Sequence, residues 1–378
     1  MSIQQQNAVC PAILIGLNEI LKDGAPDSLF TQVGLTQALL DPTNRQPGSV
    51  VQNVDAQNGN PKTVRIKHKQ RATPSDTATA KDCATGTPKP YFEEIFTVNQ
   101  YRQHTINVKE STIRTLCDAS SQLKAVPGAA FNTWEGNSYN LQLMAEQVME
   151  IMMDFDAMRQ AINNDLHTSA ALGIGGYVGT AAGTGKKFNM YRTTNTSGLQ
   201  EGSLVLSGFN EFKREMARTT LTGQPIVVGE GYLDLAMAAL DYGCCNISGN
   251  DFGQMKSNPG FKYYKDFTMG NSIGSADYDF LAFMPGTMQF ASYNEYVGGY
   301  ARPIGVVERG TIPDPVLPGV TYDMRIIPNA CSGSSVVESY DVIIGLHFDL
   351  WQAPVNQFQS ADRLANVNGI FHGQVGTL

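Results

Sequence analysis

The longest regular pattern along the chain is an apolar stripe between Asn137 and Thr168. Hydrophobic residues recur there at alternating three- and four-residue spacing, which is the period of one face of an α-helix. The members of the stripe are Leu141, Met144, Val148, Ile151, Phe155, Met158 and Ile162. We therefore predict one uninterrupted helix over residues 137–168, about 48 Å long at ~1.5 Å per residue. An average globular helix has only about three to four turns.

The polar side of this predicted helix is acidic. Glu146, Glu150 and Asp154 follow one another at four-residue intervals, and like charges at that spacing repel. A folded protein tolerates such a stripe if water solvates it or if a cationic element lies along it. The second possibility requires a cationic element elsewhere in the chain.

The clearest cationic element lies in a stretch of period-two alternation. We predict a strand over residues 62–71 and a return strand over residues 91–108, joined by the polar segment 72–90. Lys62 begins the first strand, whose successive side chains point to opposite faces. One face is cationic and the other carries Val64, Ile66 and His68; the cationic residues are Arg65, Lys67, Lys69 and Arg71.

Two interpretations of this cationic strand stay open. Charged side chains guard many solvated strand edges against aggregation. An isolated two-stranded hairpin is, however, marginal in water, so this arm needs a surface to lie on. The sharper hypothesis is an intersubunit contact between the basic arm (Lys62, Arg65, Lys67, Lys69 and Arg71) and the acidic spine (Glu146, Glu150 and Asp154) of a neighbouring copy.

The rest of the chain divides into short elements. Two amphipathic patterns, at residues 9–21 and 29–40, are too short to be stable alone and must dock on the protein body or on another subunit. We predict a helix that begins at Ser111, and we expect Gly173 and the glycines after it to end the long helix. The remaining predictions are a loop or hairpin at 181–202, an α/β lobe at 207–297, and strands at 322–327 and 336–350. Within the lobe we predict helices at 209–218 and 233–240 and strands at 225–228, near 263–269 and at 278–284.

Composition excludes several classes of protein. A net charge of −8 argues against a general nucleic-acid binder, because such proteins cluster cations to displace counterions from phosphates. The first twenty residues lack the features of a signal peptide or a membrane span, so we expect a soluble, cytoplasmic product. The six cysteines have neither disulfide-scaffold nor zinc-site spacing.

Motifs that resemble catalytic or binding signatures lack the required context. Ser272, in Gly270–Gly274, matches a nucleophile elbow, but a polar strand precedes it and a second strand follows, so we predict a hairpin turn. The run at 183–187 lacks key residues of a phosphate loop, and Gly229-Glu230-Gly231 lacks the third glycine of a dinucleotide fingerprint. The five histidines form no metal motif, so we expect each of them to be structural or to lie on the surface. We expect no catalytic residue, cofactor or metal.

The order of the predicted elements resembles a known family, the major capsid proteins of tailed bacteriophages with the Hong Kong 97 phage fold. The run Phe283-Met284-Pro285-Gly286-Thr287-Met288-Gln289-Phe290, followed by Tyr293-Asn294-Glu295, is similar to the strand, Pro-Gly turn and strand of such proteins. The strand at 340–351 is similar to one that lies beside their spine helix. The resemblance covers nearly the whole chain and rests on element order, without an invariant motif.

This resemblance implies an α+β capsid fold with five parts. They are an N-terminal arm (1–44), an extended β-hairpin loop (45–110), a peripheral domain (111–200) with a long spine helix (137–168), an axial α/β domain (201–300), and a return to the peripheral domain (301–378). It also implies an icosahedral shell of hexamers and pentamers around a tailed phage's double-stranded DNA.

The resemblance also implies the partners of such a shell protein. Because elements begin by Val9, no long built-in scaffold precedes them, and we expect a separate scaffolding protein. A portal protein, a decoration or cement protein, and non-specific contact with packaged DNA complete the expectation, without a membrane. The protein would reside in the virion capsid after assembly in the host cytoplasm. An encapsulin-type nanocompartment shell is the alternative, and a serine hydrolase using Ser272 is a distant third.

Overall fold

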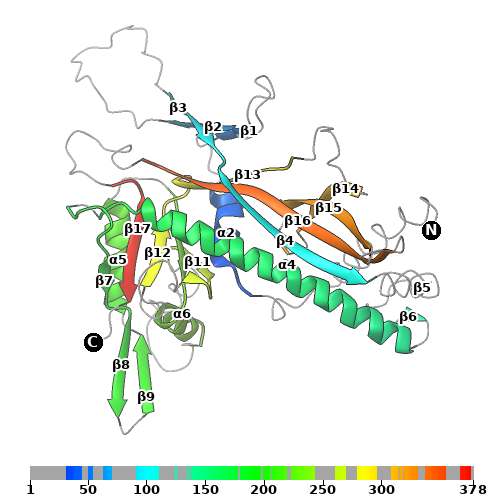
Figure 1. Ribbon diagram of the computed structural model, residues 1–378. Helices are drawn as coiled ribbons and strands as arrows, with labels where there is room; N and C mark the ends of the chain where they lie inside the picture. The colour runs from blue at the N-terminus through cyan, green and yellow to red at the C-terminus, as the bar shows by residue number, and fades with distance from the viewer. Residues whose placement is uncertain are drawn as a thin grey trace. The chain divides into compact units, whose positions relative to one another are not determined.

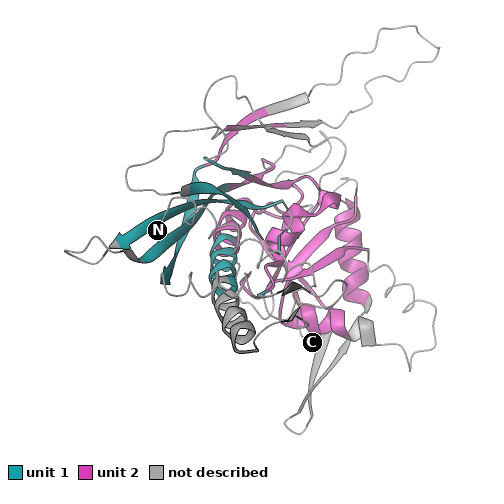
Figure 2. Ribbon diagram, turned by 90° about the vertical axis from the view of Figure 1, so that its right-hand side faces the viewer, with its two compact units in different colours: residues 1–31, 99–162, 292–348 teal, residues 32–98, 163–291, 349–378 magenta. Residues whose placement is uncertain are grey.

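The chain is described here from a computed structural model with two compact units (Figure 2). Unit 1 takes in residues 1–31, 99–162 and 292–348, and unit 2 takes in residues 32–98, 163–291 and 349–378. The structure describes residues 31–44, 50–53, 63–69, 91–109, 124–125, 134–135, 138–177, 179–196, 199–204, 206–218, 223–242, 260–269, 279–295, 308–314, 316–317, 319–330, 337–354 and 367–375. The five-part division of the sequence stays a prediction.

The predicted long helix is present as α4 (Ser138–Leu172), which has 35 residues. It ends one residue before Gly173, whose N–H bonds the carbonyl of Ala170 at 3.1 Å, so the predicted stop is confirmed. Phe155, Met158 and Ile162 of the apolar stripe are at most 2% exposed. The side chains of residues 138–151 lie outside the described part of the chain.

Unit 1 is built on antiparallel strand pairs: β14 pairs with β15, β15 pairs with β16, and β16 pairs with β4. Its strands are β14 (Glu308–Pro313), β15 (Thr321–Ala330), β16 (Val337–Gln352) and β4 (Gln100–Lys109). β4 and β16 run alongside α4 (Figure 1). The rings of Phe155 on α4 and Tyr322 on β15 have centroids 5.8 Å apart. The closing strands therefore pack on the apolar side of the helix, as predicted.

Unit 2 contains a mixed sheet in the order β11-β10-β12-β17-β7. Its strands are β11 (Lys262–Lys265), β10 (Ile226–Gly229), β12 (Asp279–Phe283), β17 (Ile370–Val375) and β7 (Lys186–Phe188), and the helices α5 (Leu206–Arg218) and α6 (Tyr232–Tyr242) accompany them. A cluster of phenylalanine rings, among them Phe188, Phe212 and Phe280, fills its core.

The α/β lobe predicted at 207–297 is correct in its elements but wrong as one contiguous stretch. β17 comes from the end of the chain and lies between β12 and β7. The predicted hairpin near 181–202 is present as β8 (Tyr191–Thr196) and β9 (Leu199–Leu204). The predicted Pro-Gly turn, in which Gly286 has φ +81°, connects β12 to β13 (Met288–Tyr293).

The arm differs from its prediction in two ways. It is a three-stranded antiparallel sheet of β1 (Val50–Asn53), β2 (Thr63–Lys69) and β3 (Tyr91–Thr97), because β1 adds a strand beside β2. The single predicted return strand is divided at Val98 and Asn99 into β3 and β4. β4 pairs along its whole length with β16, and its Ile106 and Val108 are buried in unit 1. Their burial explains why the period-two alternation of the sequence continues beyond β3 into β4.

The remaining elements are short. They are α2 (Gly34–Leu40), the 3-10 turn η2 (Pro42–Asn44), β5 (Lys124–Ala125) and β6 (Trp134–Glu135). The predicted helix at 29–40 is therefore present in shortened form. The pattern at 9–21 and most of the helix predicted from Ser111 lie outside the described residues. Helices and mixed sheets together confirm the α+β class.

Candidate functional site

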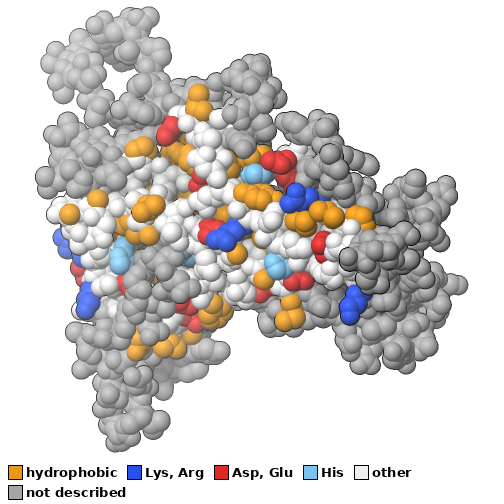
Figure 3. Space-filling model, viewed as in Figure 1, with side chains coloured by type: hydrophobic (Ala, Val, Ile, Leu, Met, Phe, Trp, Pro, Cys, Tyr) orange, Lys and Arg blue, Asp and Glu red, His pale blue; other side chains and the backbone are white. Residues whose placement is uncertain are grey.

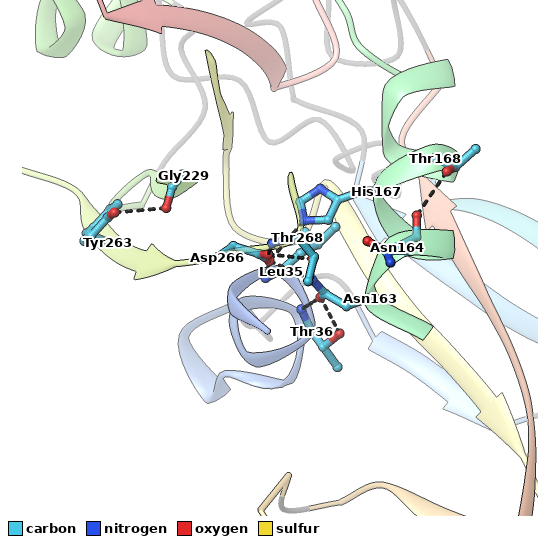
Figure 4. Close-up of polar contacts among 10 residues, drawn as sticks. All are labelled: Leu35, Thr36, Asn163, Asn164, His167, Thr168, Gly229, Tyr263, Asp266 and Thr268. Atoms are coloured by element: carbon cyan, nitrogen blue, oxygen red, sulfur yellow. Dashed lines mark hydrogen bonds and ion pairs between the residues drawn. The ribbon is translucent and has the colours of Figure 1, made fainter. Parts of the chain in front are cut away.

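The most developed polar site in the structure is centred on Asp266 in unit 2, just after β11 (Figure 4). Its Oδ2 accepts hydrogen bonds from the backbone N–H of Leu35 (2.7 Å), from Asn163 Nδ2 (2.8 Å) and from His167 Nε2 (3.0 Å). Its Oδ1 accepts from the N–H and Oγ1 of Thr268, at 2.8 and 2.7 Å. Because a carboxylate only accepts, His167 carries its proton on Nε2.

Asn163 connects this cluster to α2. Its Oδ1 accepts from the N–H and Oγ1 of Thr36, at 2.9 and 2.7 Å, while its Nδ2 donates to Asp266 and Thr268. This division of donors and acceptors defines the orientation of the amide. Asn163 of the long helix thus holds α2, although this polar residue is not part of the apolar stripe that predicted the helix.

The electrostatics of Asp266 follow from its partners. Burial alone would raise the pKa of the Asp266 carboxyl, but the hydrogen bonds and the charge of His167, with the bonds from Asn163 and Leu35, hold that pKa at about 2. Both the Asp266 and His167 side chains are 0% exposed. Hydrogen bonds to the charged form of a buried carboxylate stabilise it strongly. A substrate cannot reach this pair, so the cluster has a structural role: it holds α2, α4 and the residues after β11 together.

A second polar cluster holds the end of the same segment. Asp41 accepts hydrogen bonds from Lys262 and Tyr264 of β11 and from Thr43. Burial acts to raise the pKa of Asp41, yet the bond from Lys262 and those from Thr43 and Tyr264 lower it well below its usual range. The bond to Asp41 in turn raises the pKa of Lys262. Two clusters therefore secure α2 as part of unit 2.

Three further histidines also contact carboxylates. His104 Nε2 on β4 lies 2.8 Å from Asp154 on α4. His347 Nε2 on β16 lies 3.0 Å from Glu295, which follows β13. His372 Nε2 on β17 lies 2.6 Å from Asp279 on β12. Sequence reasoning assigned the histidines structural or surface roles and missed their partners, since no local signal connects positions so far apart.

The residues of the basic arm and the acidic spine are only partly described. Arg65, Lys67 and Lys69 occupy alternate positions of β2 and so lie on one face; Lys62 and Arg71 lie outside the described residues. Glu146 and Glu150 lie on α4, within the stretch whose side chains are not described. Asp154 pairs with His104 in its own chain. The contact between the two sets in neighbouring copies stays a prediction.

The two faces of the arm sheet differ in burial. On the even face Ile66 is 1% exposed, and Glu94 accepts a hydrogen bond from the indole Nε1 of Trp351 at 3.1 Å. On the odd face Ile95, opposite Arg65 in the register, is 65% exposed. Among the described side chains of the sheet, Ile66 on the even face is therefore buried, Glu94 on the same face is bonded within unit 2, and Ile95 on the odd face is exposed.

Other predicted features have plain structural outcomes. Ser272 lies outside the described residues. The run at 183–187 leads into the strand β7, and Gly229-Glu230-Gly231 is a tight turn from β10 to α6. Among the described residues, no helix has the length and hydrophobicity to cross a bilayer, and no group of three ligating side chains could hold a metal ion. On the face in Figure 3, described acidic, basic and hydrophobic side chains are interspersed.

Comparisons with known proteins find a likeness in structure only. No protein-family model and no curated protein matches the chain. Among solved structures it is similar to a capsid protein of cyanophage A-1(L), at 11% identity and a TM-score of 0.43 over 85% of this chain and 93% of that one. The mature capsid of bacteriophage PhiM1 matches at 10% identity and a TM-score of 0.36, over 84% and 83%.

A third similar structure is a virus-like particle from Pyrococcus furiosus. It matches at 7% identity and a TM-score of 0.38, over 96% of both chains. The structures to which this chain is similar thus include phage capsid proteins.

Proposed function

We propose that this protein is the major capsid protein of a tailed bacteriophage. Copies of it would assemble as hexamers and pentamers into the icosahedral shell that encloses double-stranded DNA. The observation that carries the proposal is the order of elements: an extended arm sheet, a 35-residue spine helix, a mixed α/β sheet and long closing strands beside the helix. This is the order that the capsid resemblance implies.

The exposed side chains support a role in assembly. Ile95 on the arm, Met153 on α4 and Leu172 at the end of α4 are 65%, 70% and 88% exposed in the single chain. Single exposed apolar side chains are normal on a protein surface, but removal of these three from water would stabilise contacts between copies. In a shell, contact with neighbouring copies would remove them from water, and symmetry would repeat each contact around a closed ring.

The partners and location follow from the same proposal. The protein acts structurally, without a catalytic residue or cofactor. It assembles in the host cytoplasm with a separate scaffolding protein, surrounds a portal protein at one vertex, and forms part of the virion. A decoration protein and weak, non-specific contact with packaged DNA complete its partners, and the net charge of −8 keeps the DNA contact weak.

Assembly of the purified protein tests this proposal directly. The chain, expressed alone and with candidate scaffolding proteins, should elute as capsomers or megadalton shells in size exclusion and appear as rings or shells in negative-stain images. A stable small globule under all these conditions refutes the proposal. Shells that contain packaged DNA in an infected host distinguish a phage capsid from a nanocompartment, whose shell would enclose protein cargo instead.

The contact between the basic arm and the acidic spine has its own test. Reversal of Arg65 and Lys67 to Glu should block or loosen assembly, and Glu146→Lys with Glu150→Lys should partly restore it. A single exposed ion pair contributes only about 0.2 to 1 kcal/mol, but repetition around a shell multiplies the effect. If the reversed arm assembles normally at low salt, where screening is weakest, the contact is refuted.

A further inference from the structure

We propose that His347 operates a proton-sensitive clamp in unit 1, which holds the end of β13 on the sheet at mildly acidic pH and loosens it as the pH rises. The clamp consists of His347 on β16, the rings of Tyr101 and Tyr293, and the carboxylate of Glu295. All four residues belong to unit 1 of a single copy, so the inference goes beyond the proposed shell function and does not depend on it.

The imidazole of His347 lies beside two tyrosine rings. Its centroid is 4.3 Å from that of Tyr101 on β4, at an interplanar angle of 34°, and 4.5 Å from that of Tyr293 on β13, at 15°. His347 is directly opposite Tyr101 in the register of β16 and β4, and β13 also neighbours β16 in the sheet. The electron-rich face of an aromatic ring attracts a cation close to it, so both tyrosines favour the protonated imidazole.

Gly345 makes room for the first of these rings. A Cβ at that position would lie 2.4 Å from the hydroxyl oxygen of Tyr101, so the ring lies across the backbone of β16 where a larger residue would displace it. Tyr101 Oη donates to Gln103 Oε1 at 3.3 Å, and Arg325 Nη2 donates to the same oxygen at 2.9 Å. These contacts hold the ring beside His347, although Tyr101 is 43% exposed.

A carboxylate meets the edge of the same imidazole. His347 Nε2 lies 3.0 Å from Oε1 of Glu295, and the two side chains are 15% and 48% exposed. Water screens this attraction, and an exposed ion pair contributes little by itself. The backbone N–H of Glu295 also donates to Asp323 Oδ2 at 2.7 Å, which attaches the chain to β15. The clamp therefore combines an ion pair, two aromatic rings and a backbone hydrogen bond.

The other charges near His347 also favour its protonated form. Asp323 on β15 and Asp349, two positions further along β16, lie on the same face of the sheet as His347. Arg325 on β15 shares that face and opposes protonation, but it donates to Gln103. Together with Glu295, three carboxylates stand against one guanidinium, so the local charge favours the imidazolium.

The direction of the pH response follows from the form that the site favours. Histidine ordinarily changes its charge near neutral pH, and opposite charges and aromatic faces both stabilise its charged form. The closed clamp therefore binds a proton more tightly than the open one. Its stabilisation is fully present below the ordinary histidine pKa of ~6.5 and is lost as the pH rises through the pKa of the closed form.

Nuclear magnetic resonance of the full chain, labelled with ¹³C at histidine Cε1, tests proton binding directly. The signal that disappears in His347→Gln should titrate with a midpoint above ~6.5, and Glu295→Gln and Tyr101→Leu should each lower that midpoint. The matched control is Asp154→Asn, which removes the carboxylate beside another histidine, His104, and should leave the midpoint unchanged. A midpoint at or below ~6.5, or one that neither variant moves, overturns the proposal.

Amide hydrogen exchange measures whether the clamp opens. The N–H of Glu295, which donates to Asp323, reports on the attachment of the chain after β13. After correction for the intrinsic pH dependence of exchange, its protection should fall several-fold between about pH 5.5 and about pH 8.5, which lie on either side of the ordinary histidine pKa. His347→Gln should show the lower protection at both pH values.

Equal protection at both pH values in the native chain, or the same fall in His347→Gln, overturns the clamp. Glu295→Gln keeps the test decisive if His347→Gln fails to fold, because it changes a side chain that is 48% exposed and should reduce the pH-dependent fall. Neither measurement requires assembly, so failure of the clamp and failure of the proposed shell function are distinguishable.

Discussion

Substitution of Asp266 by asparagine should destabilise unit 2 strongly while leaving its shape nearly unchanged. Three donors converge on Oδ2 and two on Oδ1 of this carboxylate. An asparagine side chain accepts through one atom only, so in either orientation at least two donors face an NH₂ group. A buried donor left without an acceptor costs about 1 to 3 kcal/mol. We therefore expect a loss of about 3 to 5 kcal/mol, the range for a broken buried pair.

The pH dependence of the same variant provides a second measure. The pKa of Asp266 is lowered from 3.8 to about 2, so its stabilisation is present above the unfolded pKa and is lost as pH falls toward 2. This lowering of the Asp266 pKa corresponds to a stabilisation of about 2 kcal/mol. The native chain should lose that amount progressively between about pH 5 and pH 1, and Asp266→Asn should lack this part of the acid-induced loss.

Guanidinium denaturation of unassembled subunits, followed by tryptophan fluorescence, measures both effects. The matched control is Asp341→Asn, because Asp341 accepts one exposed hydrogen bond, from Asn107 Nδ2 at 2.6 Å, that an asparagine oxygen can also accept. The control should change stability by less than about 0.5 kcal/mol. If Asp266→Asn unfolds at the same denaturant concentration as this control, the hydrogen bonds of Asp266 do not stabilise unit 2 and the reasoning is wrong.

Two further substitutions test how the segments are held. Gly34→Ala places a Cβ 2.4 Å from the backbone oxygen of Lys265, so in thermal melts it should lower the unfolding free energy by more than about 2 kcal/mol. The control Gly310→Ala should be neutral in the same melts, because the nearest atom to its added Cβ is 4.0 Å away. Trp351→Phe removes the donor to Glu94 and should cost about 1 to 3 kcal/mol, with faster amide exchange in β2 and β3. Unchanged exchange there would show that this bond does not hold the arm.

The elements that were predictable from the sequence are those with a local period. The long helix needed only the three-and-four spacing of residues such as Phe155, Met158 and Ile162, because each turn of a helix satisfies its own backbone. α5, α6, β10 and β16 followed from equally local patterns. The end of α4 followed from Gly173, since glycine favours helix termination.

The elements that were missed depend on partners distant in the sequence. β17 has too short a pattern to be recognised alone and becomes a strand by pairing with β12 and β7. The division of the return strand at Val98 has no clear local signal. It occurs because β3 pairs with the arm strand β2, whereas β4 pairs with β16.

The polar clusters show most plainly that a local sequence pattern does not identify distant partners. The sequence by itself determined that His167 and Asn163 lie on a helix four residues apart, and that Lys67 and Arg65 share one face of a strand. Only the tertiary structure decided that Asp266, 99 residues after His167, supplies the carboxylate between them and Leu35. Periodicity specifies which face of an element a residue occupies. The identity of the group that meets that face depends on packing between distant segments, where burial makes each unsatisfied donor costly.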